Sequence, residues 1–237
     1  MHTQLDLRGS IPSVIDITPA KKADVNWLDD LMFEAGSFYI MDRGYVDFER
    51  LFSIAKVKAF FVTRAKVNLR FSRRSSRPIE DSSMVCSDQI GKLSIPKTRD
   101  SYPIPLRRIR FYDAENKRYF IFLTNNLELP EEIIAQLYKM RWDVELFFKW
   151  IKKNLRIKHF YGNSLNAVKT QIWISIAVYV IIAILQKELN LPGTLHRSLQ
   201  LLSVHPFEKI PIHQLLVETD FQNNEDQPCN QMMLFNL

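Results

Sequence analysis

One segment near the middle of the chain combines an acid, two bases and a phenol at helical spacing. Tyr138, Arg141, Glu145 and Lys152 occur within a predicted helix that covers about residues 129–154. At about 100° per residue, these four side chains would fall within about 60° of arc on one side of an α-helix. A carboxylate there could bind a metal ion while the neighbouring cations contact phosphate groups. The spacing therefore predicts a site for phosphate chemistry.

The same residues have a second, purely structural interpretation. Arg141 and Glu145 are four residues apart, so they could form a surface ion pair worth about 0.2–0.5 kcal/mol beside a solvated lysine. The rest of the helix, however, is more apolar than a solvated surface helix needs. Its apolar residues are Leu137, Val144, Leu146, Phe147, Phe148, Trp150 and Ile151. Periodicity alone leaves both interpretations open.

A second carboxylate, that of Asp42, follows a short apolar and aromatic segment. Residues 37–41 are typical of a strand buried on both faces, and this strand ends at Asp42, before Arg43 and Gly44. An aspartate in such a position commonly caps or shapes a turn. If Asp42 lies beside Glu145, however, the two carboxylates could hold two divalent cations about 4 Å apart.

A cationic segment follows the next predicted strand, residues 59–63. It opens with Arg64 and Lys66 and contains no acidic residue before Glu80. Its other members of interest are Arg70, Phe71, Arg73, Arg74 and Arg77. Such a run is either a solvated loop or a groove for the DNA backbone, with Arg64 and Lys66 as its first contacts.

Elements from distant parts of the chain must position these residues. Residues 2–18 predict a hairpin, and helix, strand, helix and strand patterns follow. This order is typical of a mixed α/β sheet. Residues 64–126 contain β-prone segments joined by Ser, Pro and charged turns, which predicts a β-rich insertion. After the long helix, a second helix is predicted over about residues 164–189.

Composition limits the classes of protein that the chain can represent. Of its 237 residues, 46% are hydrophobic and 24% charged, which is typical of a globular protein. A formal net charge of +6 and a pI near 9.3 favour a polyanionic partner. Cys86 and Cys229 have neither disulfide nor zinc-site spacing, and the polar N-terminus lacks the apolar core of a signal peptide. A cytoplasmic protein is therefore expected.

An apolar run over residues 172–185 raises the alternative of a membrane-associated protein. This run has 14 residues, fewer than the roughly 18–20 needed to span a bilayer. Lys169, Gln171 and Gln186 flank it. We therefore interpret the run as a buried core helix and expect no membrane partner.

The pattern Tyr-x2-Arg-x3-Glu-x6-Lys resembles the signature of insertion-sequence transposases of the IS-four family. Four other phrases look like blocks of this family, in the family's order: HTQLDLRGSIPSVIDIT, MDRGYVDFERL, AFFVTRAK and IKHFYGNSLNAVKTQIWISIA. The resemblance covers most of residues 2–185. It implies a DDE transposase with an RNase H-like fold, which moves an insertion sequence by cut-and-paste DNA cleavage and strand transfer.

The resemblance also implies a role for each matching residue. Asp42 matches the second catalytic aspartate and Glu145 the catalytic glutamate, and both would bind a pair of Mg²⁺ ions, or Mn²⁺ in their place. Tyr138, Arg141 and Lys152 match the positions with which the family holds the DNA end near the active site. The implied partners are transposon-end and target DNA and a second copy of the chain in a DNA-bound homodimer.

By the same resemblance, the chain divides into four parts. Residues 1–63 would be the first part of the RNase H-like catalytic core, which the β-rich insertion at 64–126 interrupts. Residues 127–190 would be the helical remainder of the core, and residues 191–237 a C-terminal tail.

The chain departs from the family at its start. Family members need a third carboxylate, the first aspartate, on the opening strand of the sheet, and this chain begins after that strand. Asp6 and Asp16 lie in the following hairpin, whose family counterpart does not carry the catalytic aspartate. We therefore expect little or no strand cleavage by this chain as given. The alternative function is a non-catalytic remnant that binds DNA or inhibits a full-length partner.

Overall fold

The chain forms two compact units in a computed structural model. The structure describes residues 1–18, 24–66, 68–79, 84–114, 117–154, 162, 164–190, 195–204, 209 and 211. The first unit comprises Met1–Thr3 and Ile15–Glu145, and the second comprises Gln4–Val14 and Leu146–Leu237.

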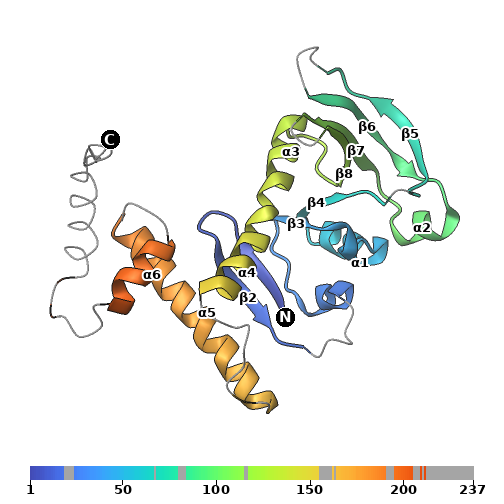
Figure 1. The fold of residues 1–237 in the computed structure, drawn as a ribbon. Coiled ribbons are helices and arrows are strands. Elements are labelled where there is room, and N and C mark those ends of the chain that lie inside the picture. Colours follow the sequence, from blue (N-terminus) through green and yellow to red (C-terminus); the bar gives the residue numbers. More distant parts are fainter. Residues whose placement is uncertain are drawn as a thin grey trace, which may run out of the picture. The chain divides into compact units, whose positions relative to one another are not determined.

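A six-stranded mixed sheet forms the centre of the first unit (Figure 1). Its strand order is β3-β4-β8-β7-β6-β5. The strands are β3 (Phe38–Met41), β4 (Phe60–Arg64), β5 (Phe71–Ser76), β6 (Val85–Leu93), β7 (Leu106–Asp113) and β8 (Arg118–Thr124). β3 pairs with β4 in parallel, and the other neighbouring pairs are antiparallel. The predicted α/β fold with a mixed sheet is confirmed.

The β-rich residues after β4 extend the same sheet. β8 pairs with β4 through Val62↔Thr124 and Thr63↔Leu123, and β7, β6 and β5 follow outward. The cationic segment of the sequence partly forms a strand, since Arg73 and Arg74 lie on β5 with exposed side chains.

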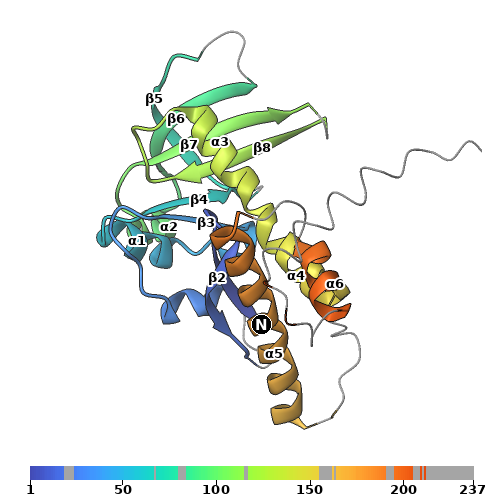
Figure 2. The ribbon, with the colours of Figure 1, turned by 90° about the vertical axis from the view of Figure 1, so that its left-hand side faces the viewer.

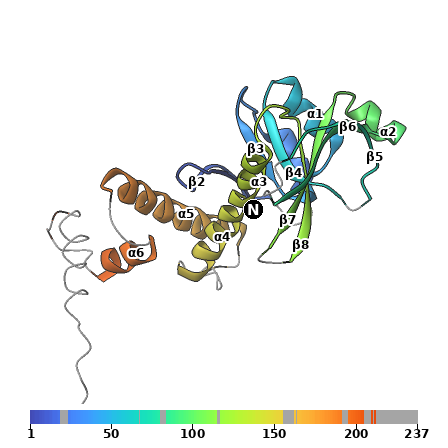
Figure 3. The ribbon, with the colours of Figure 1, turned by 90° about the horizontal axis from the view of Figure 1, so that it is seen from above.

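Helices pack on both faces of this sheet (Figures 2 and 3). Neighbouring strand residues point to opposite faces, so Phe61 and Val62 belong to two different clusters. On one face, α1 (Phe48–Lys56) and α2 (Pro96–Ser101) lie against a cluster of Leu51, Ile54, Phe61, Leu93, Tyr102 and Leu106. On the other face, α3 (Glu131–Met140) contributes to a cluster of Val62, Val85, Ile109, Phe122, Ile134 and Tyr138.

The elements before β4 occur in the predicted order. β1 (His2–Asp6) and β2 (Ile11–Asp16) form the N-terminal two-stranded sheet. The first predicted helix is a 3₁₀ helix, η1 (Asp24–Asp30). A short 3₁₀ turn, η2 (Arg43–Tyr45), separates β3 from α1.

The prediction of one long helix through Asn154 is wrong at Arg141. The helix ends with α3 at Met140, and α4 (Trp142–Asn154) begins two residues later. The N–H of Arg141 donates to the Tyr138 carbonyl at 3.1 Å, and the N–H of Val144 donates to the Arg141 carbonyl at 3.3 Å. Such three-residue hydrogen bonds make a tighter turn than an α-helix. The interruption is short, because Arg141 keeps α-helical dihedral angles and still pairs with Glu145 four residues later.

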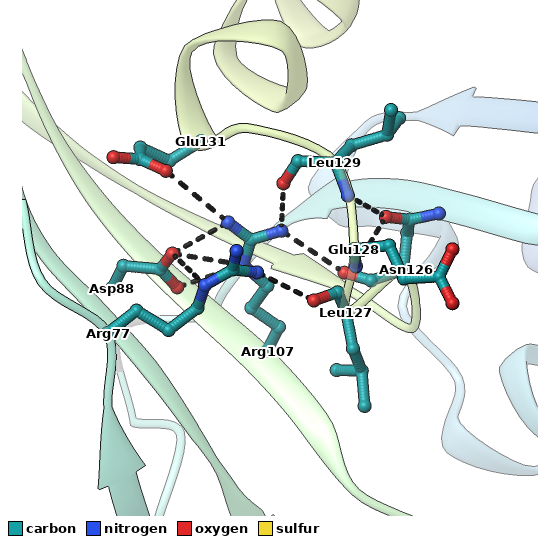
Figure 4. A network of polar contacts seen from close by, with 8 residues as sticks. All are labelled: Arg77, Asp88, Arg107, Asn126, Leu127, Glu128, Leu129 and Glu131. Carbon is teal, nitrogen blue, oxygen red and sulfur yellow. Dashed lines mark hydrogen bonds and ion pairs between the residues drawn. The ribbon is translucent and has the colours of Figure 1, made fainter.

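A buried ion pair ties the start of α3 to the sheet (Figure 4). The side chains of Arg107 on β7 and Asp88 on β6 are both 0% exposed, and their closest atoms, Nη2 and Oδ2, lie 2.6 Å apart. Arg107 also donates to the Leu129 carbonyl just before α3 and lies 3.6 Å from Glu131 in its first turn. Arg77, the residue that follows β5, completes the network with its Nε 3.7 Å from Asp88 Oδ2. One arginine thus connects β6, β7 and the beginning of α3.

The second unit contains residues of the β1–β2 hairpin as well as helices, and Tyr179 contacts both parts. This residue lies on α5 (Leu165–Glu188), which is followed by α6 (Leu195–Val204). Its phenol donates to the Ser10 carbonyl at 2.8 Å. Its ring meets Phe147 and Trp150 of α4 edge-on, with centroids 4.8 and 5.0 Å apart.

Helix α5 contains the apolar run singled out in the sequence. By length and composition it is the one described helix that could cross a membrane, and 28% of its apolar window is buried within the protein. Its buried residues are Ser175, Ile176, Tyr179, Ile182 and Ala183. Trp173, Ile174 and Ile181 are exposed. The buried residues recur every three to four positions, so the predicted core role applies to one face of α5.

Candidate active site

Asp42 stands at the end of β3, where its carboxylate is exposed. The parallel register places Met41 opposite Thr63, and the Thr63 hydroxyl donates to the Asp42 carbonyl at 3.4 Å. The N–H of Tyr45 donates to the same carbonyl at 3.0 Å, which closes the η2 turn. The Asp42 side chain makes no capping hydrogen bond. Backbone atoms therefore hold the turn, and the carboxylate is available for another role.

Tyr138 of α3 reaches this carboxylate. Its hydroxyl donates to Asp42 Oδ1 at 3.4 Å, while its ring lies on Phe122 with centroids 4.8 Å apart. Burial raises the pKa of the Tyr138 phenol; the positive charge of Arg141 opposes this rise, and the negative charge of Asp42 adds to it. The phenol consequently stays protonated and acts as a donor to Asp42.

Arg141 and Glu145 form the ion pair that the structural interpretation predicted. Arg141 Nη1 lies 2.8 Å from Glu145 Oε1, with the two side chains 22% and 45% exposed. Burial disfavours the charge of Arg141, but the hydrogen bond with Glu145 and the nearby negative charges outweigh it and raise the arginine's pKa. The Nε of Arg141 is buried and has no hydrogen-bond partner within the described part of the chain.

The four residues form one continuous series of contacts. Asp42 contacts Tyr138, the guanidinium of Arg141 lies 5.7 Å from the Tyr138 ring centroid, and Arg141 pairs with Glu145. The series connects the end of β3 with residues that lie 96 or more positions later in the sequence. A phenol and a guanidinium thus connect the Asp42 carboxylate, at the end of β3, to the Glu145 carboxylate. We call these four residues the carboxylate site.

The other three predicted residues have different surroundings. The guanidinium of Arg64, at the end of β4, lies 5.3 Å from the Phe120 ring centroid, and its charge acts on the pKa of Tyr138. Lys66 is tied to the chain just after the η2 turn, because its Nζ donates to the Val46 carbonyl at 3.0 Å. Lys152 is exposed and lies in the second unit, seven residues after Glu145 on α4.

Comparison with known proteins decides the family. The family model of the transposase DDE domain matches residues 1–181. The chain belongs to this family. It is 37% identical over 188 residues to y4zB of Sinorhizobium fredii, a protein named as a transposase, covering 78% of the chain and 52% of that protein.

Two further relatives carry the names of transposases of insertion sequences. For element IS5377 of Geobacillus stearothermophilus, the identity is 27% over 184 residues, 77% of the chain and 48% of the relative. For element IS4SA of a Synechocystis species, it is 26% over 178 residues, 72% of the chain and 48% of the relative. The resemblance stated from the sequence is confirmed at the level of the DDE family. The DDE chain spans about half the length of these relatives.

The carboxylate oxygens of Asp42 and Glu145 are of the chemical type that binds a hard divalent cation. DDE transposase domains generally use divalent metal ions, and exposed carboxylate oxygens are the ligands that Mg²⁺ prefers. Within the described residues, however, no group of three or more His, Cys, Asp or Glu side chains is close enough to hold a metal ion. Asp42 and Glu145 could therefore supply part of a metal site, with water, phosphate or another carboxylate completing it.

Sequence reasoning missed two residues that support the carboxylate site. Thr63 is fully buried and holds the Asp42 backbone, but its role depends on the register between β3 and β4. Arg107 holds the start of α3, the helix that presents Tyr138, through residues from other parts of the chain. Strand periodicity could have placed Arg107 on the face of Ile109, but no local signal identifies Asp88 as its partner.

Proposed function

We propose that this chain provides two metal-binding carboxylates, Asp42 and Glu145, to a DNA transposase that cleaves and rejoins strands at the ends of an insertion sequence. The observation that carries this proposal is the contact series from Asp42 through Tyr138 and Arg141 to Glu145. Membership of the DDE family supports the reaction class, because such enzymes act on DNA phosphodiesters.

Each side chain would have a separate task. Asp42 and Glu145 would hold Mg²⁺ or Mn²⁺, which when bound supplies activation of a water or 3′-hydroxyl and stabilisation of the leaving oxygen. Tyr138 would keep Asp42 oriented through its hydroxyl. Arg141 would turn from Glu145 to a DNA phosphate, since its Nε has no acceptor in the described part of the chain. Lys152 would bind a further phosphate as a point charge.

A second candidate function is that of a non-catalytic subunit that binds DNA or inhibits a full-length partner. It is favoured by the presence of only two carboxylates in the site formed by the described residues, because two carboxylates are expected to hold two cations poorly. In either case the proposed partners are DNA and a second transposase chain, and the proposed compartment is the cytoplasm.

Nicking of a supercoiled plasmid in Mn²⁺ tests the proposal. The plasmid would carry the gene of this chain with its flanking DNA, and nicked product would be measured on gels. We expect little nicking by the wild type, and less by Asp42→Asn and Glu145→Gln. Asp100→Asn, on the exposed helix α2, serves as a charge-matched control.

The outcomes separate the two functions. Equal nicking by all four proteins would contradict a role for Asp42 and Glu145. A wild type that binds the plasmid without nicking it, and lowers excision when co-expressed with a full-length relative, would support the inhibitory function instead.

A further inference from the structure

Two arginines project from the sheet face opposite α3. Arg108 and Arg110 alternate on β7 with Arg107 and Ile109, which face the α3 side. On β6, Arg108 stands opposite Gln89 and Arg110 opposite Ser87, and on β8 Arg110 stands opposite Ile121. The surface is hollowed between these strands, and the hollow is lined by Ser87, Gln89, Arg108, Arg110, Tyr119 and Ile121.

Aromatic rings and an amide hold both guanidinium groups in place. Arg110 lies over Tyr119 with its guanidinium carbon 4.2 Å from the ring centroid, and Arg108 lies over Phe71 at 4.6 Å. Arg108 Nη2 also donates to Gln89 Oε1 at 2.6 Å. Stacking covers the flat face of a guanidinium and leaves N–H groups along its edges, which is the geometry that binds phosphate in a bidentate manner.

No ion pair between described residues neutralises the positive charge of this face. Arg73, on β5 opposite Gly91, adds a third guanidinium, and its charge acts on Arg108. Burial, followed by the charge of Arg73, lowers the pKa of Arg108. No ion pair joins Arg73, Arg108 or Arg110 to an acidic residue in the part of the chain that the structure describes. An anion placed beside Arg73 and Arg108 would therefore relieve the repulsion between them.

The face is separate from the carboxylate site. Tyr138 packs on Phe122, which points to the α3 side of β8, whereas Tyr119 and Ile121 point to the other side. Tyr119 is 55% exposed and Ile121 is 38% exposed. A chain of phosphates could reach the three arginines without entering the space around Asp42.

We propose that Arg73, Arg108 and Arg110, which we call the arginine face, bind the backbone of DNA at a position separate from the carboxylate site. This inference rests on the proposed function, because that function makes DNA the polyanion present. The contacts would be to phosphates, so binding here would be independent of base sequence and would weaken as salt is raised. The face would hold flanking DNA while the carboxylate site engages a strand.

Fluorescence anisotropy with a labelled 30-base-pair duplex of arbitrary sequence, titrated at several salt concentrations, tests the arginine face. Each phosphate contact contributes about 0.9 to the slope of log K against log salt. We expect Arg110→Gln to lower the slope by about 0.9, and Arg108→Gln with Arg110→Gln to lower it by about 1.8. Arg110→Lys should keep the slope and lose affinity, because it preserves the charge but not the planar fork.

Arg99→Gln is the matched control, since it removes one charge from an exposed arginine beside Asp100 on α2. Its slope should stay at the wild-type value. The inference is overturned if the chain binds no duplex at low salt, or if the Arg108 and Arg110 variants keep the slope of Arg99→Gln. Because Arg110 is exposed, its single substitution keeps the test available if the double variant fails to fold.

The carboxylate variants distinguish this failure from failure of the proposed function. Asp42→Asn with Glu145→Gln should bind the duplex with an unreduced salt slope, whether or not nicking is lost. Loss of nicking in that variant together with unchanged binding by the arginine variants would overturn the arginine face and leave the proposed function standing.

Discussion

Two arginine–carboxylate ion pairs in the first unit have similar N···O distances but differ greatly in burial. Arg107 and Asp88 lie 2.6 Å apart with both side chains 0% exposed. Arg141 and Glu145 lie 2.8 Å apart with side chains 22% and 45% exposed. Arg107 uses its remaining donors on backbone carbonyls before α3, whereas Arg141 Nε has no acceptor among the described residues.

The difference shows that an arginine–carboxylate pair can either fix the structure or remain free to change partners, depending on its burial. Two buried charges that satisfy each other are costly to separate, because removing one leaves the other unpaired in a medium of low dielectric. A half-exposed pair is separated at little cost, because water and ions replace the partner. Arg107 is therefore suited to fixing α3, and Arg141 to exchanging Glu145 for a phosphate.

The largest effect is expected from Arg107→Met. This change leaves the Asp88 carboxylate buried, and among the described residues its remaining ion-pair partner is Arg77, 3.7 Å away. We expect the free energy of unfolding to fall by about 3–5 kcal/mol, as measured by urea denaturation. Arg77→Gln is the control from the same network, and it should cost less because Arg77 is 33% exposed. A loss below about 1 kcal/mol for Arg107→Met would show that the buried pair stabilises the fold no more than an exposed pair does.

A smaller effect on the free energy of unfolding is expected from Tyr138→Phe. This effect should depend on pH in alkaline solution. At neutral pH, losing the hydroxyl contact with Asp42 should cost about 0.5–1 kcal/mol. Burial raises the pKa of Tyr138, so the unfolded phenol ionises first. The stability from this group is then present below about pH 10 and is lost as pH rises through the folded pKa.

Urea unfolding between pH 9 and 11 measures this dependence. Tyr138→Phe should lose stability less steeply with pH than the wild type. Some dependence should persist in the variant, because burial also raises the pKa of Tyr102. Identical slopes for the two proteins would show that Tyr138 does not contribute.

The smallest effect on stability is expected from Arg141→Met. Its ion pair with Glu145 spans one helical turn and is partly solvated, so the loss should be about 0.5 kcal/mol or less. Plasmid nicking in Mn²⁺ should nevertheless fall, because Arg141 would no longer bind phosphate. A stability loss as large as that of Arg107→Met would show that both pairs are structural.

Local sequence patterns predicted much of the fold and the pairing within the candidate site. Alternation and short apolar runs located β3 and β4, and with them the strand end that carries Asp42. The four-residue spacing predicted the contact between Arg141 and Glu145. These features depend on neighbours along the chain, which the sequence displays directly.

Features that depend on distant partners were not predictable in the same way. The turn at Arg141 has no proline or glycine near it, so nothing local indicates that α3 ends there. Arg107, Arg108 and Arg110 look alike in the sequence, yet Arg107 is buried because the sheet register brings Asp88 beside it. Strand register and burial are set only when the sheet assembles, and they decide which arginines are buried and which are accessible.

The most direct test of whether Asp42 and Glu145 share a metal site is a double-mutant cycle on Mn²⁺ affinity, measured by electron paramagnetic resonance. Asp42→Asn and Glu145→Gln are compared singly and together, with Asp100→Asn as the control. If the two carboxylates share one site, each change should weaken binding, and the double change should weaken it by less than the sum of the two. Additive effects, or an affinity equal to that of Asp100→Asn, would contradict a shared site formed by Asp42 and Glu145.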